Sequence, residues 1–311
     1  MREDAVIVEI LGVKTYAFGV WVAVGLALAL CLLALLSRKM KWKQGAFLTF
    51  AVLALPLGFV FSRLLYCFVD ESLGFSMPLW AIAQVNIGGF SIMGALLGAC
   101  LAAVIAGKIA GMHAAQLMDC LGPAFLMLVI FERLGERVIE GFGQSRALTM
   151  DLFINSFLAV EGDNGYFLAT YMIEAAAAAV LCAILILDLK VTRRAGDTFI
   201  KFMLLFGATQ IILESLRYDQ HMTVHAFVRI EQILSMTLLG VGVIVLAVRN
   251  WKNRFKLSLA AVILIPVVVG IGVCIEFMID RTGINRLLLY AVFSLLVAVP
   301  AWLGLKLRRR A

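Results

Sequence analysis

The chain has 311 residues, of which 63% are hydrophobic and 15% are charged, and its mean hydropathy is +1.01. A soluble protein of this length carries about 25% charged residues and could not keep so much apolar surface from water, so the composition excludes a water-soluble globular protein. The net charge of +7 does not indicate a nucleic-acid partner, because the basic residues gather in short connections where anionic lipid headgroups are their natural partners.

Apolar runs of about 20 residues recur along the chain, and each is long enough to cross a hydrocarbon core of roughly 30 Å as a helix. The runs are continuous rather than alternating, which favours helices over strands. Nine spans are predicted, at residues 16–37, 46–69, 88–107, 114–132, 165–187, 197–216, 229–248, 257–277 and 286–305. The sequence therefore predicts an all-α, polytopic membrane helical bundle.

Orientation follows from the basic residues, because 17 of the 27 lie in every second connection. Those connections are residues 38–43, 108–113, 188–197 with Lys201, 249–256 and the C-terminal tail. By the positive-inside rule this side is cytoplasmic, so we expect the N-terminus outside and the C-terminus in the cytoplasm. The first span is not expected to be a cleavable signal, because acidic residues precede it and no clear cleavage site follows.

The connections on the outer side are longer, notably residues 70–87 and 133–164, and we expect them to form a head or roof over the bundle. All six cysteines lie within or at the ends of spans, and none forms a CxxC pair. We therefore expect apolar packing from them rather than a zinc site or disulfides. No known hydrolase, metalloprotease or nucleotide-binding motif occurs, and no cofactor or metal is expected.

Ionisable and amide side chains at lipid depth are few, and such residues mark a lumen, an ion pair or a site. The candidates are Arg63, Asp119, Glu174, Gln210, Glu214, Arg217, Glu231 and Gln232. Glu174 is predicted to lie about nine residues into the fifth span, near the middle of the bilayer.

Two polar faces are predicted at the same outer depth. One, in "FGATQIILESLR", consists of Phe206, Gln210, Glu214 and Arg217. The other, in "FERLGERVIE", exists if the helix continues and consists of Arg133, Glu136, Arg137 and Glu140. If the faces meet they form a charged pocket suited to a phospholipid headgroup, because guanidinium binds phosphate in a bidentate manner. A structural ion pair beside a solvated helix end explains the same residues, and composition alone favours that reading.

Several motifs resemble, in order, those of the bacterial prolipoprotein diacylglyceryl transferases over about residues 1–250. "YAFGVWVAVGL" resembles the family's first span, "FSRLLY" its Gly-Ala-Arg segment with Arg63 kept, and "GGFSIMGALLG" its Gly-Gly-Met-Ser-x-His-Gly-Gly segment. "FERLGERVIEGFG" resembles the signature Gly-Arg-x-Gly-Asn-Phe-x-Asn-Gly-Glu-x-x-Gly, with Arg133 and Gly135 matched directly and Glu140 matched after one deletion. "TYMIEA", "FGATQIILESLR" and "EQILS" resemble three later motifs and keep Glu174, Glu214 and Arg217.

The resemblance implies a seven-span core at residues 1–250, followed by two additional spans and a basic tail at 251–311. It also implies a multi-pass enzyme of the bacterial plasma (inner) membrane. This enzyme would move a diacylglyceryl group from phosphatidylglycerol, or another anionic phospholipid, to the lipobox cysteine of prolipoproteins. In that reading Arg133, Gly135 and Arg63 bind the phospholipid, and Glu214, Arg217 and Glu140 are catalytic.

Three positions depart from the family pattern. Met93 stands where the family has histidine, Gln210 where it has arginine in the sixth span, and Glu136 where it has asparagine. Glu136 beside a phosphate would repel it unless Arg137 neutralises the carboxylate. The alternative is therefore a catalytically altered relative that binds phospholipid or lipoprotein segments without transfer. A transporter or channel ranks last, because the polar residues concentrate in the outer half of the spans.

Overall fold

A computed structural model describes residues 6–10, 13–69, 89–139, 141–148, 151–162, 165–191, 194–218, 224–225 and 228–308. Within them, nine helices are long and apolar enough to cross a membrane. These are α1 (Ala17–Lys39), α2 (Ala46–Val69), α3 (Ile92–Ala110), α4 (Ala114–Gly135), α6 (Thr170–Val191), α7 (Asp197–Leu216), α8 (Ile230–Arg249), α9 (Phe255–Arg281) and α10 (Arg286–Arg308). The predicted polytopic all-α membrane bundle is confirmed.

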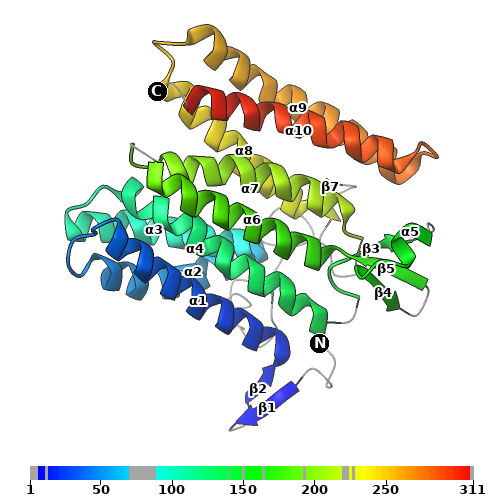
Figure 1. Ribbon diagram of the computed structural model, residues 1–311, viewed down its shortest axis with the longest axis horizontal. Coiled ribbons are helices and arrows are strands. Elements are labelled where there is room, and N and C mark those ends of the chain that lie inside the picture. Colours follow the sequence, from blue (N-terminus) through cyan, green and yellow to red (C-terminus); the bar gives the residue numbers. More distant parts are fainter. Residues whose placement is uncertain are drawn as a thin grey trace.

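The helices lie side by side, with α1 and α2 at one edge of the bundle and α9 and α10 at the opposite edge (Figure 1). We call the end where α4 and α7 finish and α6 and α8 begin the site end, and the other the basic end. Contacts between connections close the basic end: Lys43 Nζ donates to Gly111 O at 2.6 Å, and Arg249 pairs with Asp197 at 3.0 Å. The assignment of this end to the cytoplasm stays a prediction of the positive-inside rule.

Helices α2 and α3 pack backbone against backbone through small residues of α3. A methyl group added at Gly98 would overlap the backbone of Leu57 and Gly58, and one added at Gly94 would overlap Phe61 and Ser62. Lipid tails are as apolar as leucine, so helix association in a bilayer depends on close van der Waals contact that only small residues permit. This contact fixes α3 against α2 and so builds one wall of the bundle.

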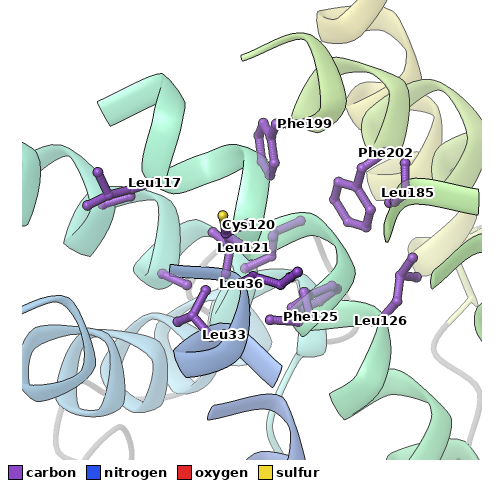
Figure 2. Close-up of a cluster of buried hydrophobic side chains, with 14 of the residues drawn as sticks. Leu33, Leu36, Leu117, Cys120, Leu121, Phe125, Leu126, Leu185, Phe199 and Phe202 are labelled. Carbon is purple, nitrogen blue, oxygen red and sulfur yellow. The ribbon is translucent and has the colours of Figure 1, made fainter. Parts of the chain in front are cut away.

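Helix α4 is the centre of the larger hydrophobic core (Figure 2). Its residues Leu117, Leu121 and Phe125 recur every four positions and therefore share one face. Phe125 makes T-shaped ring contacts with Phe202 at 5.8 Å and Phe206 at 6.1 Å between centroids, both on α7. These contacts fix α7 against α4, so their last turns reach the site end together.

A second core joins α9 and α10 to α7 and α8. It includes the buried side chains of Leu204 on α7, Val243 on α8, Ile275 on α9 and Phe293 on α10. Leu204 also lies against Gly304 of α10, where an added methyl group would come within 2.8 Å of it. The last two helices are therefore packed into the bundle and not merely appended to it.

Short strands occur in the connections at the site end. They are β1 (Val6–Ile10), β2 (Val13–Tyr16), β3 (Gln144–Ala147), β4 (Ala159–Gly162), β5 (Gly165–Ala169), β6 (Val224–His225) and β7 (Val228–Arg229), and the helix α5 (Asp151–Ile154) lies beside β5. The antiparallel sheet β3-β5-β4 lies beyond the helix ends (Figure 1). The predicted long outer connection is thus partly ordered as a small head.

The predicted start of the fifth span at residue 165 is wrong by five residues. Residues 165–169 pair on both edges as β5, and α6 begins at Thr170. The apolar run continues without a break from strand into helix, so hydropathy could not mark the boundary. As a result Glu174 lies one turn into α6, near the site end and not in the middle of the bilayer.

Candidate functional site

The site begins where α4 ends. The helix stops at Gly135 and tightens into a 3₁₀ turn, η4 (Glu136–Val138). The shared helical face of Arg133, Glu136, Arg137 and Glu140 required the helix to continue, and it does not: the 3₁₀ turn buries Glu136 while Arg137 is exposed. Glu140 lies outside the described residues.

Six charged side chains from three membrane helices and η4 meet at the site end, and we call them the Arg–Glu cluster. Its members are Glu132, Arg133, Glu136, Glu174, Glu214 and Arg217. Antiparallel helices bring them together: α4 and α7 contribute their last residues, and α6 contributes its second turn. The cluster thus joins part of each predicted polar stretch, Arg133 and Glu136 from one and Glu214 and Arg217 from the other.

Arg133 contacts all four carboxylates of the cluster. Its Nη1 donates to Glu136 Oε1 at 2.5 Å, and its Nη2 lies 3.5 Å from Glu214 Oε1. Its Nε lies 2.8 Å from Glu174 Oε2 and 3.3 Å from Glu132 Oε2. One planar guanidinium therefore joins carboxylates from α4, η4, α6 and α7, which a single-point lysine ammonium could not do.

Arg217 is the second cation of the cluster. Its Nη1 lies 3.3 Å from Glu136 and 3.7 Å from both Glu174 and Glu214. Its guanidinium also stacks on Phe142, at 5.4 Å from the ring centroid. Burial alone lowers the pKa of Arg217, but attraction to Glu136, Glu214 and Glu174 outweighs it and raises the pKa above its ordinary value. Arg217 therefore remains charged at every physiological pH.

Glu136 is neutralised by Arg133 and Arg217, and not by Arg137, the neighbour considered from the sequence. A buried carboxylate is costly unless it is paired, and both arginines lie within 3.3 Å of the same Oε1 atom. Within the described part of the chain, no three His, Cys, Asp or Glu side chains are arranged to hold a metal ion.

Gly143, in the connection between η4 and β3, lies against Glu136 of the cluster. It has φ +63°, and an added methyl group would overlap the Glu136 carboxylate and come within 2.9 Å of Tyr171 Cβ. Its carbonyl accepts hydrogen bonds from Thr170 Oγ1 at 2.5 Å and from Tyr171 N at 3.1 Å. Glycine is therefore required at position 143 for two reasons: the left-handed backbone and the approach of Glu136.

Two of the residues predicted to bind phospholipid lie against other partners. An added methyl group at Gly135 would come within 2.7 Å of Trp21 Cβ on α1, so Gly135 permits the close crossing of α4 and α1. Arg63 donates to Gly89 O at 2.8 Å and lies over the rings of Tyr66 and Phe90. These neighbours belong to α2 and the segment before α3, whereas the cluster is built from α4, η4, α6 and α7.

The positions that depart from the family pattern are buried. Met93, in the first turn of α3, is 5% exposed and belongs to the larger hydrophobic core. Gln210 is 4% exposed and lies one turn before Glu214 on the same face of α7. Neither side chain can supply the ionised group that the resemblance would place there.

Glu132 was not among the predicted candidates, and Glu174 was a candidate only as an intramembrane charge, without a role in the site. The retained "TYMIEA" motif and the intramembrane charge of Glu174 were the available signals, but the misplaced helix start put Glu174 at the wrong depth. Glu132 adjoins Arg133 at the end of α4, and its side chain is only 18% exposed, so this helix end is not solvated there.

A second buried network supports the cluster from outside. Arg229 donates from Nε and Nη2 to the carbonyl oxygen of Arg217, at 3.2 and 2.8 Å. Its Nη1 pairs at 3.1 Å with Glu276 of α9, whose other oxygen accepts from Gln232 Nε2 at 2.6 Å. A residue of the additional C-terminal spans is thus two contacts away from Arg217, a link that no local pattern in the sequence could indicate.

Comparison with known proteins identifies the relatives of this chain. Residues 5–248 match the family described as prolipoprotein diacylglyceryl transferase. The phosphatidylglycerol–prolipoprotein diacylglyceryl transferase of Lactococcus lactis subsp. cremoris is 26% identical over 257 residues, which cover 81% of this chain and 96% of the relative. The enzymes of the same name from Staphylococcus xylosus (23% identical, 81% and 91% covered) and Listeria monocytogenes serotype 4a (25%, 78% and 89%) are similarly related. The chain therefore belongs to the prolipoprotein diacylglyceryl transferase family of membrane enzymes.

Proposed function

We propose that this protein moves a diacylglyceryl group from phosphatidylglycerol, or another anionic phospholipid, to the lipobox cysteine of prolipoproteins in the bacterial inner membrane. The observation that carries the proposal is the convergence of Arg133, Glu214 and Arg217 in one buried cluster at the ends of α4 and α7. Family membership supports it, because relatives named for this reaction match over most of their length. Its substrates would be the phospholipid and the prolipoprotein signal peptide, with no nucleic acid.

The reaction requires a phosphate-bearing leaving group to depart while a thiol bonds to carbon. We assign Arg133 to the headgroup phosphate, because a guanidinium can replace its bond to a carboxylate with a bidentate bond to phosphate. Arg217 would share the charge of the leaving phosphate, and Glu214 would orient both arginines. A carboxylate of the cluster released from Arg133 would then be available to accept the thiol proton. The resemblance also implies a catalytic role for Glu140 and phospholipid contacts for Gly135 and Arg63, and these stay part of the proposal.

The test is direct transfer by the purified protein. Incubation with phospholipid and a lipobox peptide should give a peptide heavier by one diacylglyceryl group, measured by mass spectrometry. Arg217→Lys keeps the charge but loses the planar fork, and we expect it to lower the rate by about 10²-fold, as loss of one charge-stabilising donor does. Arg281→Lys, an exposed position on α9, is the matched control and should leave the rate unchanged.

Two observations favour a second function. Both arginines of the cluster are paired with carboxylates. In addition, Gln210 and Met93 carry no charge at the positions where the family has arginine and histidine. The alternative is a relative that binds phospholipid or lipoprotein segments without transfer. It predicts that no adduct forms while an active relative makes it in parallel, and that lipid still binds. An adduct above the level given by Arg217→Ala would exclude this alternative.

A further inference from the structure

Glu132 is held less firmly than the other three carboxylates of the Arg–Glu cluster. Glu136, Glu174 and Glu214 each lie within 3.7 Å of both arginines. Glu132 lies 3.3 Å from Arg133 Nε, and within the described chain no second basic side chain pairs with it. Arg133 is therefore the one cation that balances Glu132, whereas the other three carboxylates are each shared between two cations.

The proposed reaction takes Arg133 away from this carboxylate, because we assign the headgroup phosphate to Arg133. The other three carboxylates then remain paired with Arg217, and Glu132 keeps no cation. A carboxylate without a counter-charge is costly in a poorly hydrated site, and taking up a proton removes that cost. Binding of the phosphate therefore makes Glu132 the member of the cluster best suited to accept a proton.

Glu132 is also the carboxylate that a second substrate can reach. Its side chain is 18% exposed, whereas the other five side chains of the cluster are 6% exposed or less. Its Oε2 atom lies beside Arg133 Nε, is buried, and receives no hydrogen bond from any described residue. The carboxyl group therefore connects the accessible side of the cluster with the position assigned to the phosphate.

We infer that Glu132 is a catalytic residue, which carries the proton of the acceptor thiol to the departing phosphate. The inference rests on the proposed function and names the carboxylate that acts there. The family motifs point the same way: Glu132 stands where the signature has glycine, and Met93 stands where another motif has histidine. This chain therefore lacks one side chain that can exchange a proton and has gained another, directly before the phosphate-binding Arg133.

The bonds and protons of this step balance without a further reactant. The sulfur of the acceptor cysteine bonds to the terminal glycerol carbon of the diacylglycerol unit, and the bond from that carbon to the phosphate oxygen breaks. One oxygen of Glu132 takes the thiol proton, and the carboxyl group gives a proton to the departing phosphate monoester. With phosphatidylglycerol as donor, the products are the diacylglyceryl thioether and glycerol phosphate. Glu132 ends in the protonation state in which it began, so the total charge of the cluster does not change.

Variants of Glu132 test this role, with phosphatidylglycerol and a lipobox peptide as substrates. Glu132→Gln keeps the shape of the side chain but cannot carry the proton. We expect kcat to fall by about 10²-fold or more, while the KM for the lipid stays within about threefold of the native value. Glu132→Asp keeps a carboxyl group and should retain at least about tenfold more activity than Glu132→Gln. Glu161→Gln makes the same chemical change at an exposed position of β4 and is the matched control, with an unchanged rate.

An acceptor peptide with selenocysteine in place of cysteine separates proton transfer from a structural role. A selenol is already ionised at neutral pH, so no proton has to leave it before it attacks. The defect of Glu132→Gln should therefore shrink to less than about tenfold with this peptide. Arg217→Lys acts on the phosphate and not on the thiol, so its defect of about 10²-fold should persist. That persistence would show that the chemical step still limits the rate.

The outcomes separate the inference from the proposed function. Native activity in Glu132→Gln, or activity in Glu132→Asp no higher than in Glu132→Gln, overturns the inference and leaves the proposed function standing. An equal defect with the two peptides shows that Glu132 holds the site in place without moving the proton, and also overturns the inference. No adduct from the native protein, beside an active relative, overturns the proposed function and the inference with it. If Glu132→Gln fails to fold, the two peptides are compared with Glu132→Asp, whose smaller defect should also shrink.

Discussion

At the scale of single residues, the cluster depends on shape as much as on charge. Arg133 contacts four carboxylates because its planar group offers three nitrogens: Glu132 and Glu174 approach Nε, and the other two carboxylates approach Nη1 and Nη2. Glu136 reaches both arginines because the chain tightens into a 3₁₀ turn and because Gly143 leaves room for it. A methyl group added at Gly143 would therefore displace the Glu136 carboxylate from the arginines without changing any charge.

Gly143→Ala tests this directly, and Gly141→Ala is its matched control. Both glycines have positive φ, +63° and +72°, but nothing lies within 4 Å of a methyl group added at 141. We expect Gly141→Ala to lower the free energy of unfolding by about 1 kcal/mol through backbone strain alone. Gly143→Ala should lower it by at least about 2 kcal/mol more, because Glu136 and Tyr171 must also move.

Thermal unfolding in detergent and the transfer assay measure the two variants. Gly143→Ala should also lower transfer, whereas Gly141→Ala should leave it near the native rate. Similar losses of stability and transfer in the two variants would show that Gly143 serves only the turn, and would contradict its role in holding Glu136.

At the scale of elements, the end of α7 is held by the three helices that follow it. Tyr290 Oη of α10 donates to Ser215 O at 3.0 Å, and Arg229, at the start of α8, donates twice to Arg217 O. Glu276 of α9 pairs with Arg229 and is 2% exposed. These bonds satisfy carbonyls that a helix end leaves without intrahelical partners, and so fix the point from which the Arg217 side chain departs.

Glu276→Ala should therefore act on the site from α9. It leaves the buried Arg229 guanidinium without its carboxylate, which costs about 3–5 kcal/mol. Glu276→Gln retains an acceptor and should cost less. Asp280→Ala, one turn further on the same helix, removes a partner of Arg146 in a pair that is about one-fifth exposed, and should cost less than about 1 kcal/mol.

Thermal unfolding and the KM for the phospholipid measure this series. We expect Glu276→Ala to raise KM as Arg217 loses its fixed position, and Glu276→Gln to restore it partly. A KM that stays at the native value in Glu276→Ala, or an equal loss of stability in Asp280→Ala, would show that the Glu276–Arg229 pair does not position the site.

At the scale of the whole molecule, the two helices beyond the family match complete the bundle. They share the second core with α7 and α8, and they supply charged partners at both ends. Glu276 serves Arg229 at the site end, and Arg308 Nη2 lies 2.5 Å from Asp188 Oδ2 at the basic end. In a bilayer, lipid tails partly replace apolar packing that is lost. They cannot replace the charged partner of a side chain that is left facing hydrocarbon.

A chain ending at Asn250 should therefore fail to give a stable protein, although it contains the whole family match. We expect low yield and aggregation in detergent, because Arg229 and Asp188 lose these partners. Co-expression of residues 251–311 as a separate chain should restore a monodisperse complex. A truncated chain that is monodisperse and unfolds at the native temperature would show that α9 and α10 are dispensable for the fold.

The spans could be predicted from the sequence because a bilayer imposes one requirement on every segment that crosses it. Each must satisfy its own backbone hydrogen bonds and present about 20 apolar residues, and both properties are local. The start of α6 could not be predicted, because Tyr166 and Phe167 are as apolar in β5 as they would be in a helix. Only pairing with β3 and β4 distinguishes the two states.

The candidate site, like the fold, has features that the sequence predicts and features that depend on how the helices pack. The helices, the depth of Arg133, Glu214 and Arg217, and their resemblance to a known signature could be predicted from the sequence, since spacing along one helix fixes which residues share a face. The packing of the helices was needed to show that Glu174 and Glu132 join them and that Glu136 faces Arg133 and Arg217 and not Arg137. It was also needed to show that Glu276 supports Arg217 through Arg229. Those contacts join residues distant in sequence, and their geometry depends on how whole helices pack, which no short stretch of chain can encode.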